Sequence, residues 1–122
     1  MTPAVKAFGP DARLRSRVEY TTVQERGRRV AMRYVILLGC PNNRTRDRLG
    51  IIASRRLGGA VVRNRAKRRL RALFRQSLAA DDRRAAQFFD VVAIPRRELA
   101  TAPWPVLEQE FRVGLARLRA AR

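Results

Sequence analysis

The spacing of apolar residues divides the 122-residue chain into strand-like and helix-like segments. Segments dominated by aliphatic, β-branched and aromatic residues predict strands over 30–40, 48–54 and 89–94. Apolar residues that recur every three or four positions predict a helix from about 60 to 77. The same spacing predicts a last helix near the C-terminus, with a core-facing stripe made of Leu107, Phe111, Leu115 and Leu118.

Capping and turn residues set the boundaries of these segments. Ser16 and Glu19 have the spacing of a capping box, which predicts a short helix that ends near the glycine at position 27. Residues 81–86 are polar and predict a connection. Residues 1–13 contain two prolines and no periodicity, so they predict a flexible N-terminal arm before a single domain over 14–122.

The order helix, strands, helix, strand, helix predicts an α+β fold, an α/β two-layer sandwich with helices packed on a sheet. A chain of this length buries roughly two-thirds of its unfolded surface, so no disulfide or metal is needed for a core. No segment approaches the ~20 apolar residues of a membrane span, and no secretory signal is visible. The single Cys40 cannot form an internal disulfide, and the chain has no histidine to activate it, so we expect a structural thiol. The expected setting is cytoplasmic.

Positive charge dominates the composition, with 28 basic residues against 10 acidic ones and a net charge of +18. From Arg55 to Arg75 there are nine basic residues and no Asp or Glu. A helix that accepts such self-repulsion favours a polyanionic partner, and the planar guanidinium of arginine suits RNA. A GC-rich genome would also raise the arginine count, although it would not remove acidic residues. A membrane surface is the weaker alternative, because no free helix has a broad apolar face.

A helical projection separates the second predicted helix into two faces. The apolar face consists of Val62, Ala66, Leu70, Leu73 and Phe74. The opposite face, about 17 Å long at ~1.5 Å per residue, carries Asn64, Arg68, Arg71 and Arg75, with Arg65 and Lys67 at its margins. A solvated charged face is the alternative interpretation, and the absence of acidic residues argues against it.

Four neighbouring residues lie outside this cationic face. Arg63 projects on the apolar side, so only its place in the first turn leaves it accessible to a partner. Arg69 flanks the apolar stripe and covers it with its stem. Gly58 and Gly59 either form a plain turn or let the backbone approach phosphate at the start of the helix.

The same segment resembles the signature of the protein subunit of bacterial ribonuclease P. The matching residues are Gly58, Ala60, Val61, Arg63, Asn64, Arg65, Lys67, Arg68 and Arg71. The surroundings are similar to the family as well: the strand at 49–51 followed by Ser54, Arg55 and Arg56, and the strand at 90–96. The resemblance extends in order from Leu14 to the last helix.

This resemblance implies a fold of order αβββαβα with a left-handed crossover, where the general rule would predict a right-handed one. It implies a subunit of an endoribonuclease that binds a catalytic RNA and promotes removal of the 5′ leader from precursor tRNA. No further protein partner is required, and Mg²⁺ is held mainly by the RNA. Carried over by position, the RNA-binding residues are Arg63, Asn64, Arg65, Lys67, Arg68 and Arg71, to which the helical projection adds Arg75.

The resemblance also implies a cleft between the first helix and the sheet that receives the leader, lined by Tyr20, Gln24, Ser54, Arg55 and Arg56. The family usually has a second aromatic residue where this chain has Gln24, and a strand position that is aromatic in some members reads Leu37. Stacking of a base on an aromatic ring is worth about 1–3 kcal/mol, so we expect weaker leader contact or hydrogen bonds from Gln24. Tyr20 could alternatively be a core residue.

The chain offers no convincing catalytic groups of its own. It has no histidine, and its acidic residues are scattered. We therefore expect the chemistry to reside in the RNA and its bound Mg²⁺. The alternatives are a structural RNA-binding protein of the ribosomal type, a DNA-binding module, and a self-sufficient nuclease, of which the last is the weakest.

Overall fold

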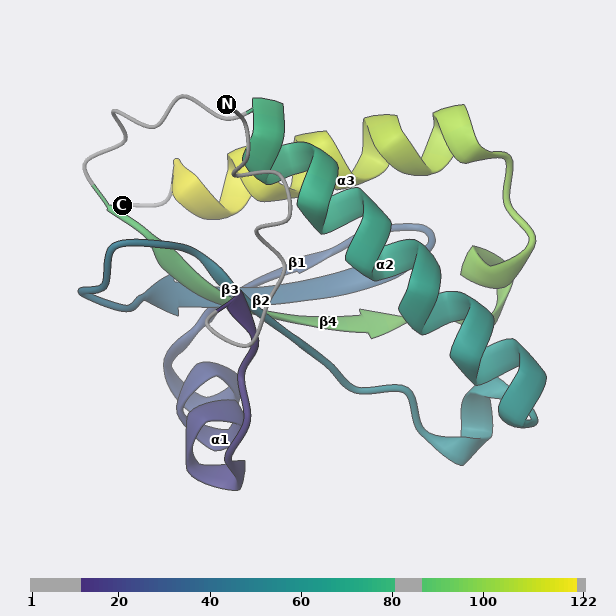
Figure 1. Cartoon of the computed structure of the whole chain (residues 1–122), viewed down its shortest axis with the longest axis horizontal. Coiled ribbons are helices and arrows are strands. Elements are labelled where there is room, and N and C mark those ends of the chain that lie inside the picture. The colour runs from purple at the N-terminus through teal and green to yellow at the C-terminus, as the bar shows by residue number, and fades with distance from the viewer. Residues whose placement is uncertain (1–11, 81–86, 121–122) are drawn as a thin grey trace.

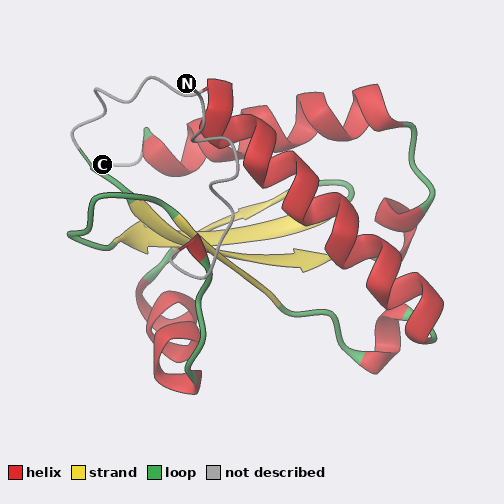
Figure 2. Cartoon of the chain, viewed as in Figure 1, coloured by secondary structure: helices red, strands yellow, loops and turns green. Residues whose placement is uncertain are grey.

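The computed structural model describes residues 12–80 and 87–120, which form one four-stranded sheet with helices on both faces (Figure 1). Helix α1 (Arg17–Arg26) lies on one face, and α2 (Ala60–Ala80) and α3 (Trp104–Arg119) cover the other. Figure 2 shows the strands as a single layer between them. The predicted α+β class in a single domain is confirmed: the sheet and the α2/α3 pair are its two main layers, and α1 adds to the far face.

The sheet has the order β1-β2-β4-β3, formed by Arg28–Ala31, Val35–Pro41, Phe89–Pro95 and Arg48–Ile51 respectively. Strand β2 pairs antiparallel with β1 and β4, whereas β3 runs parallel to β4. The connection from β3 to β4 passes through α2. In Figure 1, α2 lies above the sheet and β3 lies nearer the viewer than β4, so this crossover is left-handed.

The single strand predicted over 30–40 is wrong, because the segment forms a hairpin of two strands. The turn is closed by the Met32 N–H, which donates to the Val35 carbonyl at 3.0 Å. The Tyr34 N–H donates to Glu110 Oε2 of α3 at 2.7 Å and fixes the turn on the domain. The turn contains no Gly, Pro, Asn or Asp, so nothing in the apolar pattern marked it. The hairpin supplies the third strand before α2 that the αβββαβα order requires.

Other boundaries differ by a few residues. Strand β3 ends at Ile51 rather than 54, and α2 continues to Ala80 rather than 77. The predicted connection over 81–86 lies outside the described residues, as does most of the predicted arm. The end of that arm is packed, since Ala12 is fully buried and Arg13 forms a bridge with Leu49 of β3.

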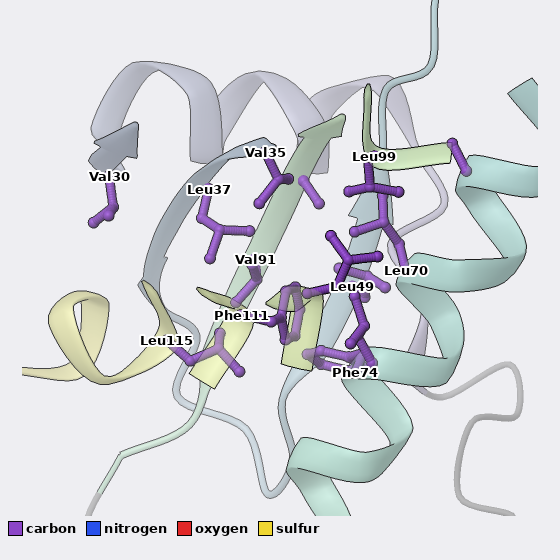
Figure 3. Packing of buried hydrophobic residues seen from close by; sticks show 14 of the residues in the cluster. Val30, Val35, Leu37, Leu49, Leu70, Phe74, Val91, Leu99, Phe111 and Leu115 are labelled. Atoms are coloured by element: carbon purple, nitrogen blue, oxygen red, sulfur yellow. The ribbon is translucent and has the colours of Figure 1, made fainter. Parts of the chain in front are cut away.

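The main core lies between the sheet and the α2/α3 layer (Figure 3). Leu37, Leu49 and Val91 point from the strands toward side chains of the two helices, among them Leu70, Phe74, Phe111 and Leu115. All four residues of the predicted α3 stripe are buried. A second, smaller core under α1 contains Leu14, Val23, Leu38 and Val92. Because strand side chains alternate between faces, neighbouring residues such as Leu37 and Leu38 belong to different cores.

Candidate nucleic-acid interface

Helix α2 begins directly after a tight turn that connects it to β3. The 3₁₀ turn η3 (Arg55–Leu57) is followed by Gly58 at φ 147°, a conformation that side chains rarely adopt. Arg63 Nη1 donates to the Gly58 carbonyl at 2.9 Å across the first turn of the helix. Arg63 is half-buried, which agrees with its predicted position on the apolar side. Gly58 is therefore required by the turn itself.

The predicted cationic face of α2 lies on the outer side of the helix. Asn64, Lys67, Arg68 and Arg71 make no side-chain hydrogen bond or ion pair with any other described residue. Asn64 and Arg68 are exposed, and Lys67 and Arg71 are half-buried along their stems. Arg75, one turn beyond Arg71, is also exposed. Unpaired side-chain donors on one helix face are what binding of a phosphate backbone requires.

Two other arginines of α2 are engaged within the protein. Arg65 Nε donates to the Ala100 carbonyl at 2.7 Å, although the residue is otherwise exposed. Arg69 Nη1 donates to the carbonyls of Leu99 and Ala102 at 2.8 and 2.7 Å, and its guanidinium lies 5.7 Å from the Trp104 ring centroid. Burial lowers the pKa of Arg69, and the neighbouring charge of Arg65 adds to this effect. Arg69 thus anchors the segment after β4, a role that the helical pattern did not indicate.

A cleft separates α1 from the sheet and consists of two hollows that share Ile52. The first, of about 440 Å³, is lined by Arg17, Tyr20, Thr21, Gln24 and Ile52. The second, of about 210 Å³, adds Ser54, Arg56, Leu57, Ile94, Pro95, Arg96 and Arg97. Four of the five predicted cleft residues therefore line this cleft. Arg55 does not line either hollow, although it is exposed on η3 beside them.

Tyr20 contributes to both the cleft and the smaller core. Its ring covers Gly50 of β3 so closely that a Cβ at position 50 would lie 2.6 Å from Tyr20 Cε1. The glycine therefore lets the ring pack closely against the strand while it still borders the first hollow. Leu37, which we compared with an aromatic cleft position, is fully buried in the main core and does not face the cleft.

A hydrogen-bond network at the start of α1 ties this helix to the sheet. The predicted capping box is confirmed: Ser16 Oγ accepts from the Glu19 N–H, and Glu19 Oε1 accepts from the N–H of Ser16 and of Arg15. The other carboxylate oxygen of Glu19 accepts from Arg48 of β3 at 3.1 Å. The two backbone donors and then Arg48 lower the pKa of Glu19 to about 2. The sequence pattern revealed the cap and missed its connection to the sheet.

Comparison with known proteins agrees with this architecture. A family model described as Ribonuclease P matches residues 8–119. The chain belongs to the Ribonuclease P protein family. A ribonuclease P protein component from Symbiobacterium thermophilum is 39% identical over 99 residues, covering 80% of this chain and 83% of the relative. Another, from Syntrophomonas wolfei, is 31% identical over 100 residues, covering 82% and 81%.

Solved structures of ribonuclease P proteins have the same fold. The protein from Thermotoga maritima superposes with a TM-score of 0.72 at 27% identity, covering 90% of this chain and 97% of that one. The Staphylococcus aureus protein, at 24% identity, has a TM-score of 0.73 and covers 87% and 94%. The resemblance drawn from the residues around Asn64 is confirmed by these matches, as is the α+β fold.

Two buried acidic side chains take part in contacts that stabilise the fold. Asp47 accepts from the Phe89 N–H and from Arg119, and Asp90 is paired with Arg48. Burial raises the pKa of the Cys40 thiol, and the nearby Asp90 carboxylate adds to this effect. Within 12–80 and 87–120, no group of three His, Cys, Asp or Glu residues could hold a metal ion. No helix in these ranges is long and apolar enough to cross a membrane.

Proposed function

We propose that this chain binds the catalytic RNA of ribonuclease P through the outer face of α2 and receives the 5′ leader of precursor tRNA in the α1 cleft. The observation that carries the proposal is the continuity of the two surfaces. The second hollow of the cleft is lined by Ser54, Arg56 and Leu57, and α2 begins three residues later. An RNA strand leaving the cleft would therefore meet the start of the cationic helix.

The two surfaces differ in chemistry, as their proposed partners do. The α2 face offers unpaired donors for phosphate from Asn64, Lys67, Arg68 and Arg71. The cleft combines an apolar floor with an aromatic edge and basic walls, formed by Ile52, Ile94, Tyr20, Arg17, Arg56, Arg96 and Arg97. Basic walls around a surface that can stack bases are typical of sites for single-stranded RNA.

The protein would act by placing positive charge and by positioning the leader, while the RNA and its Mg²⁺ perform the cleavage. The chain has no histidine to act as a general base. Neutralising phosphates lowers the repulsion between the RNA strands, so less Mg²⁺ is needed for the same rate. No further protein partner is required for this division of labour, and the proposed compartment is the bacterial cytoplasm, where precursor tRNA is made.

The test is cleavage of precursor tRNA by a bacterial ribonuclease P RNA at low Mg²⁺, with and without the protein. We expect strong stimulation by the protein and no cleavage by the protein alone. Tight RNA binding without stimulation would instead favour a structural RNA-binding protein of the ribosomal type. Cleavage by the protein without RNA would overturn the assignment of the chemistry to the RNA.

A further inference from the structure

A second cationic groove lies between the outer edge of the sheet and the end of α3. It encloses about 370 Å³ and is lined by Arg28, Arg29, Val30, Ala31, Arg117 and Ala120. The three arginines are exposed, and none of their side chains makes a hydrogen bond, ion pair or ring contact with another described residue. No acidic residue is among the described residues that line the groove. Three unpaired guanidiniums around one hollow form a site for an anion.

The backbone of β1 adds donors to the same groove. Strand β1 is at the end of the sheet, so one side of it has no strand partner within 12–80 and 87–120. The Met32 N–H bonds to Val35, and in the antiparallel register this places Val30 and Arg28 at the positions bonded to β2. The N–H groups of Arg29 and Ala31 therefore point away from the sheet, toward the outer edge. Backbone N–H groups beside guanidiniums are suitable donors for phosphate oxygens.

The groove lies apart from α2 and from the second hollow of the cleft. Arg28 is the register partner of Gly39, which lies opposite Val91 near the start of β4, whereas the cleft contains Ile94 and Pro95 near the end of β4. Strand β1 and the strand that leads into α2 form opposite edges of the sheet. Because the groove and the start of α2 lie at opposite edges of the sheet, a different RNA segment fits the groove better.

We infer that the groove binds the phosphate backbone of a second segment of the catalytic RNA, so that one RNA contacts the domain at two opposite edges. This inference rests on the proposed function. A second copy of the chain is disfavoured as the occupant, because pairing two β1 edges would bring their arginines together. The position of Arg117 in the last turn of α3 could be explained by its interaction with the negative C-terminal end of the helix dipole. Arg28 and Arg29 lie on a strand, so the helix dipole does not explain their positions.

The test compares three variants in binding to a bacterial ribonuclease P RNA across a range of salt concentrations. The groove variant is Arg28→Gln with Arg29→Gln and Arg117→Gln. Its control removes the same charge at exposed sites elsewhere, through Arg15→Gln, Arg44→Gln and Arg112→Gln. The third variant, Arg28→Lys with Arg29→Lys and Arg117→Lys, keeps the charge. Thermal melting establishes that each variant is folded.

We expect the groove variant to flatten the slope of log K against log salt by about 2–3, as the loss of three phosphate contacts requires. The lysine variant should keep most of the slope, and the control should change it by less than about 1. Hydroxyl-radical footprinting of the RNA should show one protected segment lost in the groove variant and retained in Arg68→Ala/Arg71→Ala.

Three results would overturn the inference. The groove variant could match its control in slope, it could weaken only the binding of precursor tRNA, or it could abolish self-association of the protein and leave RNA binding intact. The last result would assign the edge to a second copy of the chain. If the wild-type protein does not bind the RNA at all, the proposed function fails; if it binds through α2 and the groove variant matches its control, only the second contact fails.

Discussion

Arg48 and Asp90 lie opposite each other in the parallel β3–β4 pair and form a two-pronged ion pair. Arg48 Nε and Nη2 donate to the two carboxylate oxygens of Asp90 at 2.8 and 2.7 Å. The two side chains are 10% and 11% exposed, so water competes little for either charge. The remaining Nη1 of Arg48 reaches Glu19 in the capping box of α1. One guanidinium thus connects two strands and the helix that forms the wall of the cleft.

Removal of this guanidinium should destabilise the whole domain. Arg48→Ala leaves the carboxylate of Asp90 buried, and among the described residues its remaining side-chain donor is Asn42, at 2.9 Å. Removing one partner of a buried ion pair typically lowers the free energy of unfolding by about 3–5 kcal/mol. Urea denaturation should therefore give a much lower free energy of unfolding for Arg48→Ala, whereas Arg44→Ala, at an exposed loop position, should change it by less than about 0.5 kcal/mol. Equal stabilities for the two variants would contradict the role of the pair.

Acid should destabilise the protein partly through Glu19. Its pKa is lowered from 4.5 to about 2 in the folded state, mainly by the backbone donors of Arg15 and Ser16. A lowered pKa contributes stability above the unfolded value, and this contribution is lost as the pH falls toward the folded value. We expect the wild type to lose more stability between pH 4.5 and pH 2 than Glu19→Gln does. Parallel curves for the two proteins, measured by thermal melting, would show that the cap does not contribute.

The parts of the fold that depend on local patterns could be predicted from the sequence. The capping box at Ser16 and the α3 stripe are local because a helix brings residues three and four apart together. The cationic face of α2 followed from the same periodicity. The hairpin turn at Met32 could not be predicted, because it is held by Glu110, a residue 76 positions away in the chain. For Arg69, the helical pattern predicted only that its stem covers the apolar stripe. Its hydrogen bonds to carbonyls after β4 depend on residues about 30 positions away in the chain.

Two neighbouring arginines of α2 should therefore behave differently when they are removed. Arg69→Ala leaves the carbonyls of Leu99 and Ala102 without a donor, and hydrogen bonds to charged groups contribute about 1.5–3 kcal/mol. Arg68 has no such partner among the described residues. We expect Arg69→Ala to lower the free energy of unfolding by about 2 kcal/mol.

Arg68→Ala with Arg71→Ala should leave folding intact, weaken binding to the catalytic RNA and make that binding less dependent on salt. A folded double variant with unchanged RNA affinity would contradict the assigned face.

Gly50 should control leader binding through Tyr20. Gly50→Ala places a methyl group 2.6 Å from the position of Tyr20 Cε1, so the ring must move off the strand. We expect weaker binding of precursor tRNA and a loss of stability of about 1–3 kcal/mol, which is typical of overpacking. The cycle with Tyr20→Ala isolates the effect: in that background, Gly50→Ala should have little further influence on leader affinity. An additive loss in the double variant would mean that Gly50 acts by another route.

Gln24 offers a gain of function in the cleft. It is exposed one turn beyond Tyr20 and lines the same hollow. An aromatic ring here would give a second surface on which a base can stack, at about 1–3 kcal/mol per base. Gln24→Tyr should therefore tighten binding of precursor tRNA by about 5- to 150-fold. The affinity for tRNA without a leader should not change.

Thr22→Tyr, on the same helix but outside the hollow, is the matched control. Equal tightening by both variants would show a general effect of an added ring, and no tightening by Gln24→Tyr would place the leader elsewhere.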